Sequence, residues 1–498
     1  MKVIKERTAV NGFIGFFGNL RTVSRLSILI LIFSVCKHLF GFENLLFPPK
    51  DFQTRFRKSI TVYQLSSNPA LYRNSVKTDY TYYRFGASDR LNAFRRLYDP
   101  KRERDYGLSF FASKNLSENS TIAALAGYER TDYFNLYRSL EKDFYSNYFS
   151  YIDTTTGDVK YDGPHLWFLY NYTLADKVHL GIQVDYGVER GLKNVYTKCE
   201  TIVRNTEFST GIGYQITNRA VAGAFIRYFS RQSQYEAVKE YQDALVKTYY
   251  GYHIFRVESP RSSNYKNDFR EGYEYGFQFD TRDAILKGLE FQAMGSYGAR
   301  LTDVDVGSST SPRSRGYWVR EGRRFISGLQ YKPGESDIGF SAFYEYGDFS
   351  DWAKSGLYEV VVLENEEIKN RYSLTLYLQP SEKIDLYIGN DIEEIDCDYT
   401  EYLGGFRYLK KRKNRSAFSE ILVRWNPVLS LYLRGEVAEI QPEFYWNTDE
   451  FDINTLTLGL ERLFVFATFG LELERSKWKQ FDSDKGVDVY GISIVYKR

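Results

Sequence analysis

A strict two-residue alternation of apolar and polar side chains marks the stretch from Lys177 to Glu189. Its even positions carry only apolar or aromatic side chains, whereas its odd positions carry polar or charged side chains or glycine. A period of two predicts an extended strand with one face in an apolar medium and the other in water. Residues 178–188 rise roughly 36 Å along a strand, or about 25 Å when the strand tilts by ~45°, which matches the apolar band of a membrane barrel. The stretch therefore predicts one strand of a transmembrane β-barrel.

The same alternation recurs in pairs of segments that short turns connect. Eight such pairs, with one strand before them and one after them, predict about 18 strands, and the pattern also allows 14 or 16. We therefore expect an all-β fold, a transmembrane antiparallel up-and-down barrel. The predicted pairs are 106–112 with 122–128, 166–172 with 178–188, 206–216 with 220–230, 269–279 with 289–297, 325–331 with 338–346, 372–378 with 384–392, 421–425 with 429–437, and 456–460 with 463–473.

Long segments without alternation separate these pairs and predict loops at the barrel end opposite the short turns. Bacterial barrels carry short turns on the periplasmic side and longer loops outside the cell, so we expect these loops to be extracellular. They are Ser88–Arg104, Glu129–Asp162, Arg190–Arg204, Gln232–Asn267, Leu301–Arg320, Asp348–Glu367, Ile395–Arg415, Gln441–Phe451 and Ser476–Lys485.

The N-terminal part of the chain has a different character. Residues 1–42 hold one acidic residue, Glu6, against six basic ones, and then the apolar run Leu26–Val35. That run is too short to span a bilayer core of ~30 Å and predicts a signal peptide with its flank. Residues 43–77 lack a clean period and contain Asn68-Pro69, which favours a turn, so we expect an N-terminal periplasmic or plug segment there. The barrel is expected to occupy residues 78–498.

The composition supports a barrel and leaves few candidates for chemistry. The chain holds 44 Tyr, 37 Phe and 37 Gly, and aromatic side chains suit strands and membrane interfaces. A net charge of +2 argues against a nucleic-acid partner. With four His, no G-x-S-x-G and no H-E-x-x-H, the sequence predicts no enzyme, no metal site and no cofactor. Beyond the signal, Cys199 and Cys397 are both expected in surface loops, and their pairing stays open.

Charged side chains at the lumen-facing positions are the first candidates for function. Both signs occur in similar number, whereas a strongly selective pore would favour one sign. The mixture predicts an interior network of ion pairs, a lumen partly closed by protein, or simply a wetted wall. The candidate positions are Asp185, Glu189, Arg270, Glu274, Asp280, Glu290, Lys369, Arg371, Asp385, Arg434, Glu436 and Glu472, with Arg300, Lys332, Glu345, Asp391 and Glu474 also facing inward.

The predicted outer loops supply two further candidates. Aromatic side chains with a polar tip are good contacts for proteins or sugars, and they can equally pack loops onto one another as a cap. The basic run Lys410–Arg415 could meet lipopolysaccharide phosphates or form a solvated tip. The aromatic candidates are Tyr145, Tyr148, Tyr249, Tyr250 and Tyr252.

The element Ser67-Asn68-Pro69-Ala70 resembles the N-terminal segment of the long-chain fatty-acid transporter superfamily. In those barrels an N-terminal hatch plugs the lumen, and their relatives include the barrel subunit of the type IX secretion system. The Tyr-rich barrel with long loops also resembles uncharacterised outer-membrane barrels of Bacteroidetes. The resemblance implies an outer-membrane location and a plug that contains these four residues.

We therefore expect an outer-membrane barrel for passage or capture of a small molecule, nutrient or exported substrate, partly plugged and without catalysis. The alternative is a non-transporting scaffold that binds a surface lipoprotein or secretion partner through its loops, and an outer-membrane hydrolase is the least favoured interpretation. Outer-membrane lipid and lipopolysaccharide are the expected partners. The substrate and the oligomeric state stay open.

Overall fold

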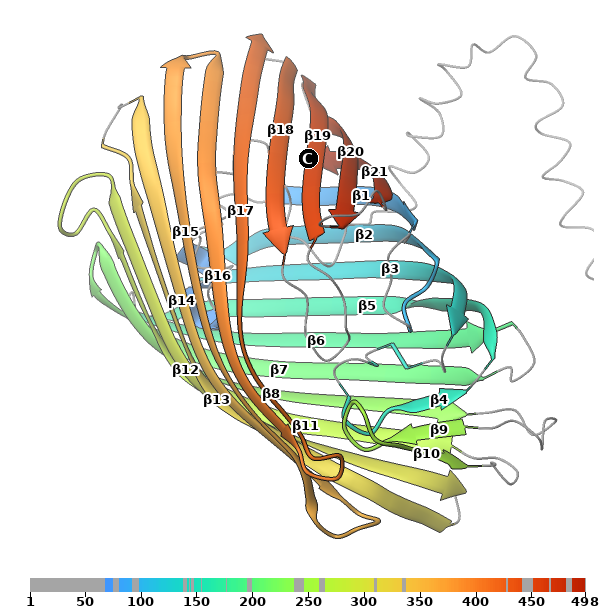
Figure 1. The fold of residues 1–498 in the computed structure, drawn as a ribbon. Helices are drawn as coiled ribbons and strands as arrows, with labels where there is room; N and C mark the ends of the chain where they lie inside the picture. Colours follow the sequence, from blue (N-terminus) through green and yellow to red (C-terminus); the bar gives the residue numbers. More distant parts are fainter. Residues whose placement is uncertain are drawn as a thin grey trace, which may run out of the picture. The chain divides into compact units, whose positions relative to one another are not determined.

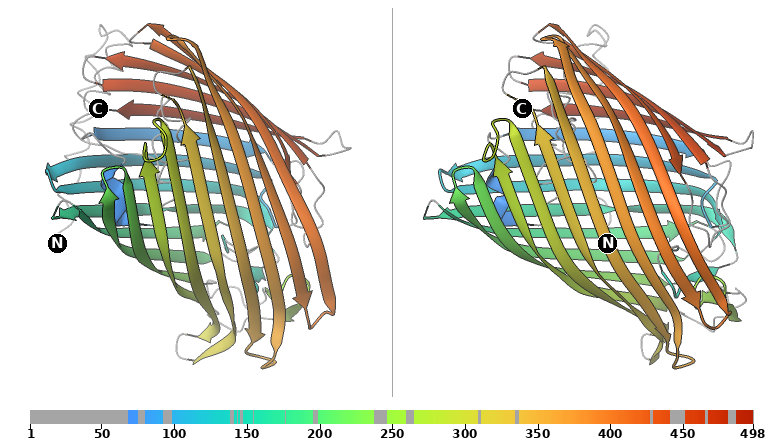
Figure 2. Two further views of the ribbon diagram at one scale, coloured as in Figure 1. Left: turned by 90° about the vertical axis from the view of Figure 1, so that its left-hand side faces the viewer. Right: turned by 60° about the vertical axis from the view of Figure 1, so that its left-hand side comes forward.

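Eighteen antiparallel strands close into one barrel in the part of the chain that the structure describes (Figures 1 and 2). The computed structural model describes residues 68–74, 80–91, 98–137 and 141–497, the last range with gaps at 143, 145–146, 154, 176, 195–198, 237–245, 259–264, 309–310, 334–336, 427–428, 441–450, 465–466 and 481–485. Each strand pairs with its neighbours in sequence, and the first strand, β1, also pairs with the last, β21, from Tyr82 opposite Lys497 to Arg90 opposite Val489. This closure confirms the predicted up-and-down barrel and the predicted strand number.

The strands of the barrel run in chain order around the wall. Their bounds are β1 Tyr80–Leu91, β2 Arg102–Ser117, β3 Ser120–Tyr137, β5 Thr156–Leu174, β6 Val178–Lys193, β7 Glu200–Thr217, β8 Ala220–Glu236, β11 Tyr265–Arg282, β12 Leu289–Ser308, β13 Ser311–Tyr331, β14 Ile338–Ser355, β15 Val361–Ser381, β16 Ile384–Glu401, β17 Phe406–Asn426, β18 Leu429–Ile440, β19 Phe451–Phe464, β20 Ala467–Gln480 and β21 Gly486–Lys497.

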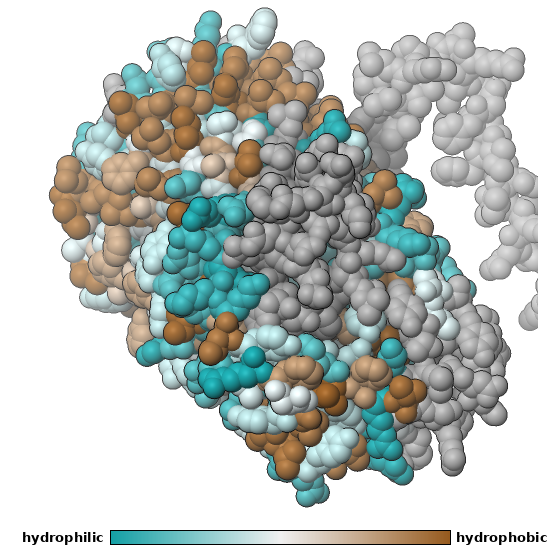
Figure 3. Space-filling view, viewed as in Figure 1, coloured by the Kyte–Doolittle hydropathy of each residue, from teal (hydrophilic) through white to brown (hydrophobic). Residues whose placement is uncertain are grey.

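The alternation of side chains sorts the two faces of the wall as the sequence predicts. On β6, Leu180, Ile182 and Tyr186 are 40–44% exposed on the outer face, whereas His179 on the inner face is 5% exposed. Large apolar side chains exposed on nearly every strand would be costly in water and are expected against lipid. Figure 3 shows apolar side chains gathered over one part of the strand wall, with a hydrophilic region beside and below it. Among the described residues, no helix has both the length and the apolar character needed to cross a membrane.

Several strands continue beyond the point where the outer face stops being apolar, and here the predicted loop boundaries are wrong. Most of Leu301–Arg320, Asp348–Glu367 and Ile395–Arg415 is strand, with tight connections between β12 and β13, β14 and β15, and β16 and β17. The basic run Lys410–Arg415 lies within β17 and Cys397 within β16, not in loops. The ladder of backbone hydrogen bonds continues there although the outward side chains have become charged.

Two small elements complete the described fold. A short 3₁₀ helix, η3 (Pro69–Asn74), precedes the barrel and contacts β5, β6, β7 and β8. A separate three-stranded sheet is built from β4 (Tyr151–Asp153), β9 (Val246–Tyr249) and β10 (Phe255–Glu258), with β9 in the middle. The predicted signal peptide lies outside the described residues, as do residues 43–67 and 75–79 around η3.

Candidate functional site

The Asn-Pro-Ala element is seated on the inner wall of the barrel near the short turns. The Asn68 side-chain amide donates to the Ile212 carbonyl on β7 at 3.2 Å, and its Oδ1 accepts the Ala70 amide at 3.0 Å. From β5, Asn171 Nδ2 donates to the carbonyls of Pro69 at 3.1 Å and Ala70 at 2.6 Å. Ala70 is 1% exposed and Leu71 is fully buried. The side chains of the wall therefore hold this element in place by its backbone as well as by Asn68.

Four glycines on the wall make room for this element. A side chain at Gly181 on β6 would overlap the backbone of Pro69 and Ala70, and one at Gly211 on β7 would overlap the Asn68 side chain. A Cβ at Gly213 would lie 2.7 Å from Leu71 Cδ2, and one at Gly223 on β8 would lie 2.5 Å from Asn68 Nδ2. Because only glycine allows such close approach of a backbone, the four positions form a fitted seat, which we call the glycine floor.

Near the opposite end, residues 141, 142, 144 and 147–153 and the β9–β10 hairpin lie against the inner wall, and together we call them the cap. Tyr148 lies 5.2 Å from Trp318 of β13, centroid to centroid, with the rings edge to face. Phe149 is fully buried, and a side chain at Gly316 of β13 would lie 2.6 Å from its ring. Tyr250 is 1% exposed and accepts a hydrogen bond from Arg315 Nη1 at 2.8 Å. These rings join Val304, Ala353, Val362, Leu363, Cys397 and Tyr399 in one buried cluster.

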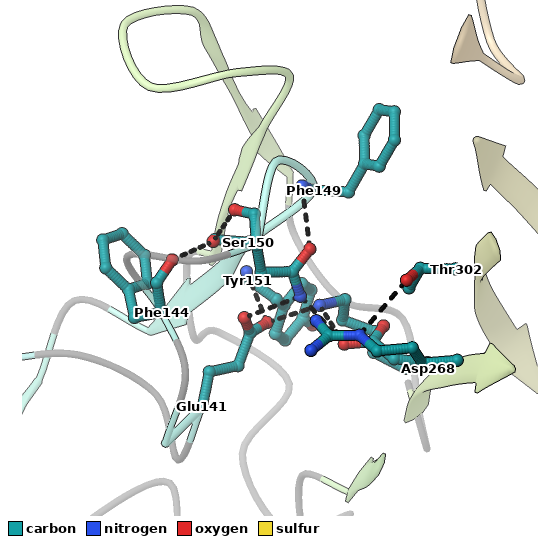
Figure 4. Close-up of polar contacts among 10 residues, drawn as sticks. Glu141, Phe144, Phe149, Ser150, Tyr151, Asp268 and Thr302 are labelled. Atoms are coloured by element: carbon teal, nitrogen blue, oxygen red, sulfur yellow. Dashed lines mark hydrogen bonds and ion pairs between the residues drawn. The ribbon is translucent and has the colours of Figure 1, made fainter. Parts of the chain in front are cut away.

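A buried group of charges attaches the first cap segment to β11 (Figure 4). Lys266 Nζ lies 2.7 Å from Glu141 Oε1 and 3.0 Å from Asp268 Oδ2, and Lys266 and Glu141 are each 1% exposed. Asn147 Nδ2 donates to Asp268 at 2.9 Å, and the Tyr151 amide donates to Glu141 at 2.7 Å. Burial raises the pKa of the Glu141 carboxyl from its ordinary 4.5 to about 7, against the attraction of the Lys266 ammonium.

A second attachment, made by Glu401, holds the tip of the β9–β10 hairpin on β16. Glu401 accepts the backbone amides of His253 at 3.2 Å and Ile254 at 3.1 Å. The same carboxylate lies 2.8 Å from His253 Nδ1 and accepts the Tyr399 hydroxyl at 3.0 Å. His253 Nε2 lies 3.1 Å from the Tyr408 hydroxyl of β17. The hairpin is thus bound to two neighbouring strands of the wall.

These contacts correct the prediction that the loop aromatics form an exposed contact surface. Tyr148, Tyr249 and Tyr250 are 5%, 6% and 1% exposed, and Tyr252 is half-buried against Tyr399. Tyr145 lies outside the described residues. Tyr148 and Tyr250 pack against apolar side chains of β12 to β16, whereas Tyr249 packs against Tyr98, Phe144 and Ile152. The alternative interpretation, a packed cap, therefore describes them.

Most of the lumen-facing charges meet an opposite charge on the wall. Glu274 lies 3.4 Å from Arg227, and Lys369 lies 2.7 Å from Glu393. Asp185 lies within hydrogen-bond distance of the His165 ring, with 2.6 Å between Oδ1 and Nε2. This arrangement is an interior network of ion pairs and not a ring of one sign. Further pairs are Glu189 with Lys142, Glu290 with Arg282, Arg371 with Asp391, Asp385 with Arg424, Glu345 with Arg324, and Arg434 with Glu420 and Glu436. Asp280 lies on β11 opposite Gln292, and the side chain of Glu472 on β20 is outside the described part.

The remaining candidates for chemistry are dispersed. Cys199 and Cys397 are both buried and neither forms a disulfide, and the Cys397 thiol donates to Asn365 Oδ1 at 3.0 Å. His179 contacts Thr173 at 3.0 Å beside the glycine floor, away from the His165–Asp185 pair. Within the described ranges, no three His, Cys, Asp or Glu side chains form a group that could hold a metal ion.

No local feature of the sequence identifies the residues that attach the cap. Glu141 and Lys266 are 125 positions apart, and Glu401 lies 148 positions from His253. No periodicity or motif connects such residues, although a charged side chain inside a Tyr-rich predicted loop is a weak indication of a buried partner. In the sequence, the glycines of the floor show only that they occupy positions on the polar face of their strands.

The chain resembles known proteins only distantly in sequence and in structure. No curated protein matches the chain. Solved structures that resemble it include BauA, the ferric preacinetobactin receptor from Acinetobacter baumannii, at 6% identity over 84% of this chain and 81% of that one, with a TM-score of 0.41. The outer-membrane transporter YddB from Escherichia coli gives 6% identity, coverage of 85% and 81%, and a TM-score of 0.41. OccAB3 from Acinetobacter baumannii is 12% identical over 84% of this chain and 99% of that one, with a TM-score of 0.35.

TM-scores below 0.5 carry no argument about this chain. The model of one protein family, described as a family of unknown function (DUF6850), matches residues 69–424, which begin at the Pro69 of η3 and end within β17. That range contains the Pro69–Leu71 part of the seated element, the whole glycine floor and the whole cap. This chain therefore belongs to the DUF6850 family.

Proposed function

We propose that this protein is an outer-membrane barrel that passes or captures a small molecule, nutrient or exported substrate, without catalysis, and that residues 43–77 plug its lumen. The observation that supports this most is the seat of Asn68–Leu71 on the glycine floor. Three neighbouring strands carry glycine at the four positions where this short element lies against them. Such a fitted contact is expected when an N-terminal segment has to close the lumen.

The plug and the cap are expected to lie at opposite ends of the barrel with respect to the membrane. In bacterial barrels the short turns face the periplasm, so η3 would lie near the periplasmic end and the cap at the outer mouth. A solute from outside would meet the cap first and the plug last. The paired charges between them suit a wall that stays wet without selecting strongly for one sign.

Single-channel current and liposome swelling test the plug directly. We expect conductance to rise when residues 43–77 are deleted from the mature barrel. The substitution Gly181→Ala should have the same effect in the full chain, because a Cβ there overlaps the backbone of Pro69 and Ala70.

A matched control exists on the same strand and the same face. At Gly187 a Cβ would meet His165 Cδ2 at 3.5 Å, an ordinary contact, so Gly187→Ala should leave conductance unchanged. Heat-dependent gel mobility of both variants shows that each has folded. Equal conductance of Gly181→Ala, Gly187→Ala and the unmodified protein would contradict the proposed plug.

We propose that the cap also obstructs the lumen. The deletion is therefore also combined with Lys266→Met, which removes the cation that attaches the cap. Absence of conductance in every form would overturn transport in favour of a scaffold that binds a surface lipoprotein or secretion partner. One observation supports that second candidate. Phe255 and Val257 on β10 are 44% and 49% exposed, and β10 forms an edge of the small sheet.

Lipid contact is proposed for the outer face of β16 and β17. Beyond Ile392 the outward side chains become charged, with Lys411 2.9 Å from Asp396 and Arg407 2.9 Å from Asp398. This change from apolar to charged side chains is expected where lipid tails give way to the headgroups and phosphates of lipopolysaccharide. A Lys411→Glu variant should therefore bind lipopolysaccharide vesicles more weakly, and equal binding would contradict the contact.

A further inference from the structure

We infer that Arg300, with Arg320 beside it, forms an oxyanion-binding site on the lumen wall under the cap, and that its ligands are small organic carboxylates. The inference rests on the proposed function, because it names a class of solute for the same lumen. Four neighbouring strands, β8, β11, β12 and β13, build the site.

The register of these strands places two like charges side by side. Arg300 of β12 pairs directly with Arg320 of β13 and, on its other side, with Gly272 of β11. Like charges directly opposite one another in a sheet are destabilising unless something neutralises them. The wall neutralises only one of the two in the described structure.

Arg320 has acidic partners on the next strands. Its Nη1 lies 3.1 Å from Asp351 Oδ2, and its Nη2 lies 3.5 Å from Glu367 Oε1. For Arg300, in contrast, no carboxylate oxygen lies within ion-pair distance among the residues that the structure describes. Nearby Glu207 and Glu274 are both turned toward Arg227, at 3.2 and 3.4 Å.

Stacking orients the guanidinium of Arg300. Its Cζ lies 4.5 Å from the ring centre of Phe229, whose ring lies over Gly272. A ring under the guanidinium covers one face of the plane and leaves the N–H groups at its edge available. The Arg300 side chain is exposed on the lumen side. A planar fork of donors with no acceptor is the arrangement that binds a carboxylate or phosphate.

The site lies next to the cap. Two residues further along β12, at the level of Thr302, Arg270 lies over the Trp318 ring at 5.0 Å, and Trp318 packs against Tyr148 of the cap. Release of Tyr148 would therefore open the path to Arg300. Capture of an anion would also relieve the repulsion between Arg300 and Arg320.

Benzoate titrated into the full-length barrel in detergent, observed by saturation-transfer NMR, tests the site without requiring transport. We expect benzoate to bind, benzyl alcohol not to bind, and Arg300→Gln to weaken benzoate binding roughly ten- to a hundredfold. Arg323→Gln is the matched control, since Arg323 lies on β13 with 70% exposure and pairs with Asp348. Its benzoate affinity should be unchanged.

The outcomes separate this inference from the proposed function. Equal benzoate binding by the Arg300→Gln and unmodified proteins, or no binding at all, overturns the oxyanion site even if the plug-deleted barrel conducts. Binding that depends on Arg300 without conductance in any plug or cap variant overturns transport and leaves the site in place. Inorganic phosphate in place of benzoate distinguishes the two sources of oxyanion: displacement of benzoate by millimolar phosphate would contradict the assignment to organic carboxylates.

Discussion

Replacing Lys266 by Met should release the first cap segment from the barrel wall. Lys266 is 1% exposed and is the cation shared by Glu141 and Asp268, which are themselves 1% and 10% exposed. Met has nearly the same length, so the substitution removes the charge and largely keeps the packing. Two carboxylates would then lie close together in a site from which water is excluded.

The size of the effect follows from this burial. Removal of one partner from a buried ion pair costs about 3–5 kcal/mol, because the remaining charge keeps its desolvation penalty. We expect a cost at the lower end of this range, roughly 3 kcal/mol, at pH 8. The pKa of Glu141 is already raised, so its carboxyl can take up a proton and lose the charge that would otherwise stay buried. An energy of ~3 kcal/mol corresponds to roughly a hundredfold change in the opening equilibrium.

Hydrogen exchange measured by mass spectrometry on cap peptides provides the assay. Amides from Asn147 to Asp153 should exchange roughly a hundredfold faster in Lys266→Met at pH 8, whereas barrel strands should be unchanged. The matched control is Lys411→Met, whose side chain is 85% exposed and whose pair with Asp396 should be worth less than about 1 kcal/mol. Unchanged exchange of the cap in Lys266→Met would refute the view that these charges hold it.

Three further outcomes follow from the same contacts. First, the pKa of Glu141 in the folded protein, about 7, exceeds its ordinary 4.5, so its contribution to cap stability is complete below pH 4.5 and lost as the pH rises through about 7. Hydrogen exchange of the cap amides, corrected for intrinsic rates, should therefore accelerate across that range. The substitution Glu141→Gln should remove most of this pH dependence. Second, Glu401→Gln should speed exchange of the 249–255 amides at least tenfold, because Glu401 accepts two backbone amides while fully buried; protection equal to the unmodified protein would show that the hairpin is held elsewhere. Third, Cys199 and Cys397 should react with a thiol reagent only after unfolding, and a reducing agent should not change gel mobility; rapid labelling of the folded barrel would contradict their burial.

The class of fold and the two faces of its wall could be predicted from the sequence because they depend on a local pattern. Val178 to Val188 shows which side chains face lipid without reference to any other strand. The same reasoning failed at Ile395–Arg415, where the outer face becomes charged but β16 and β17 continue. Side-chain hydropathy indicates whether lipid or water surrounds a strand. The strand itself forms through backbone hydrogen bonds, which residues with charged side chains make equally well.

The candidate site depended on the tertiary structure. The Asn-Pro-Ala element was visible as a motif, but its seat required glycines from β6, β7 and β8 to meet at one place. Glu141 reaches Lys266 only because the tertiary structure places the described cap residues against β11. The sequence by itself therefore determined that the chain is a barrel and which face of each strand lies against lipid. Only the tertiary structure decided what occupies the lumen, because those contacts join residues more than a hundred positions apart and leave no periodic trace in the chain.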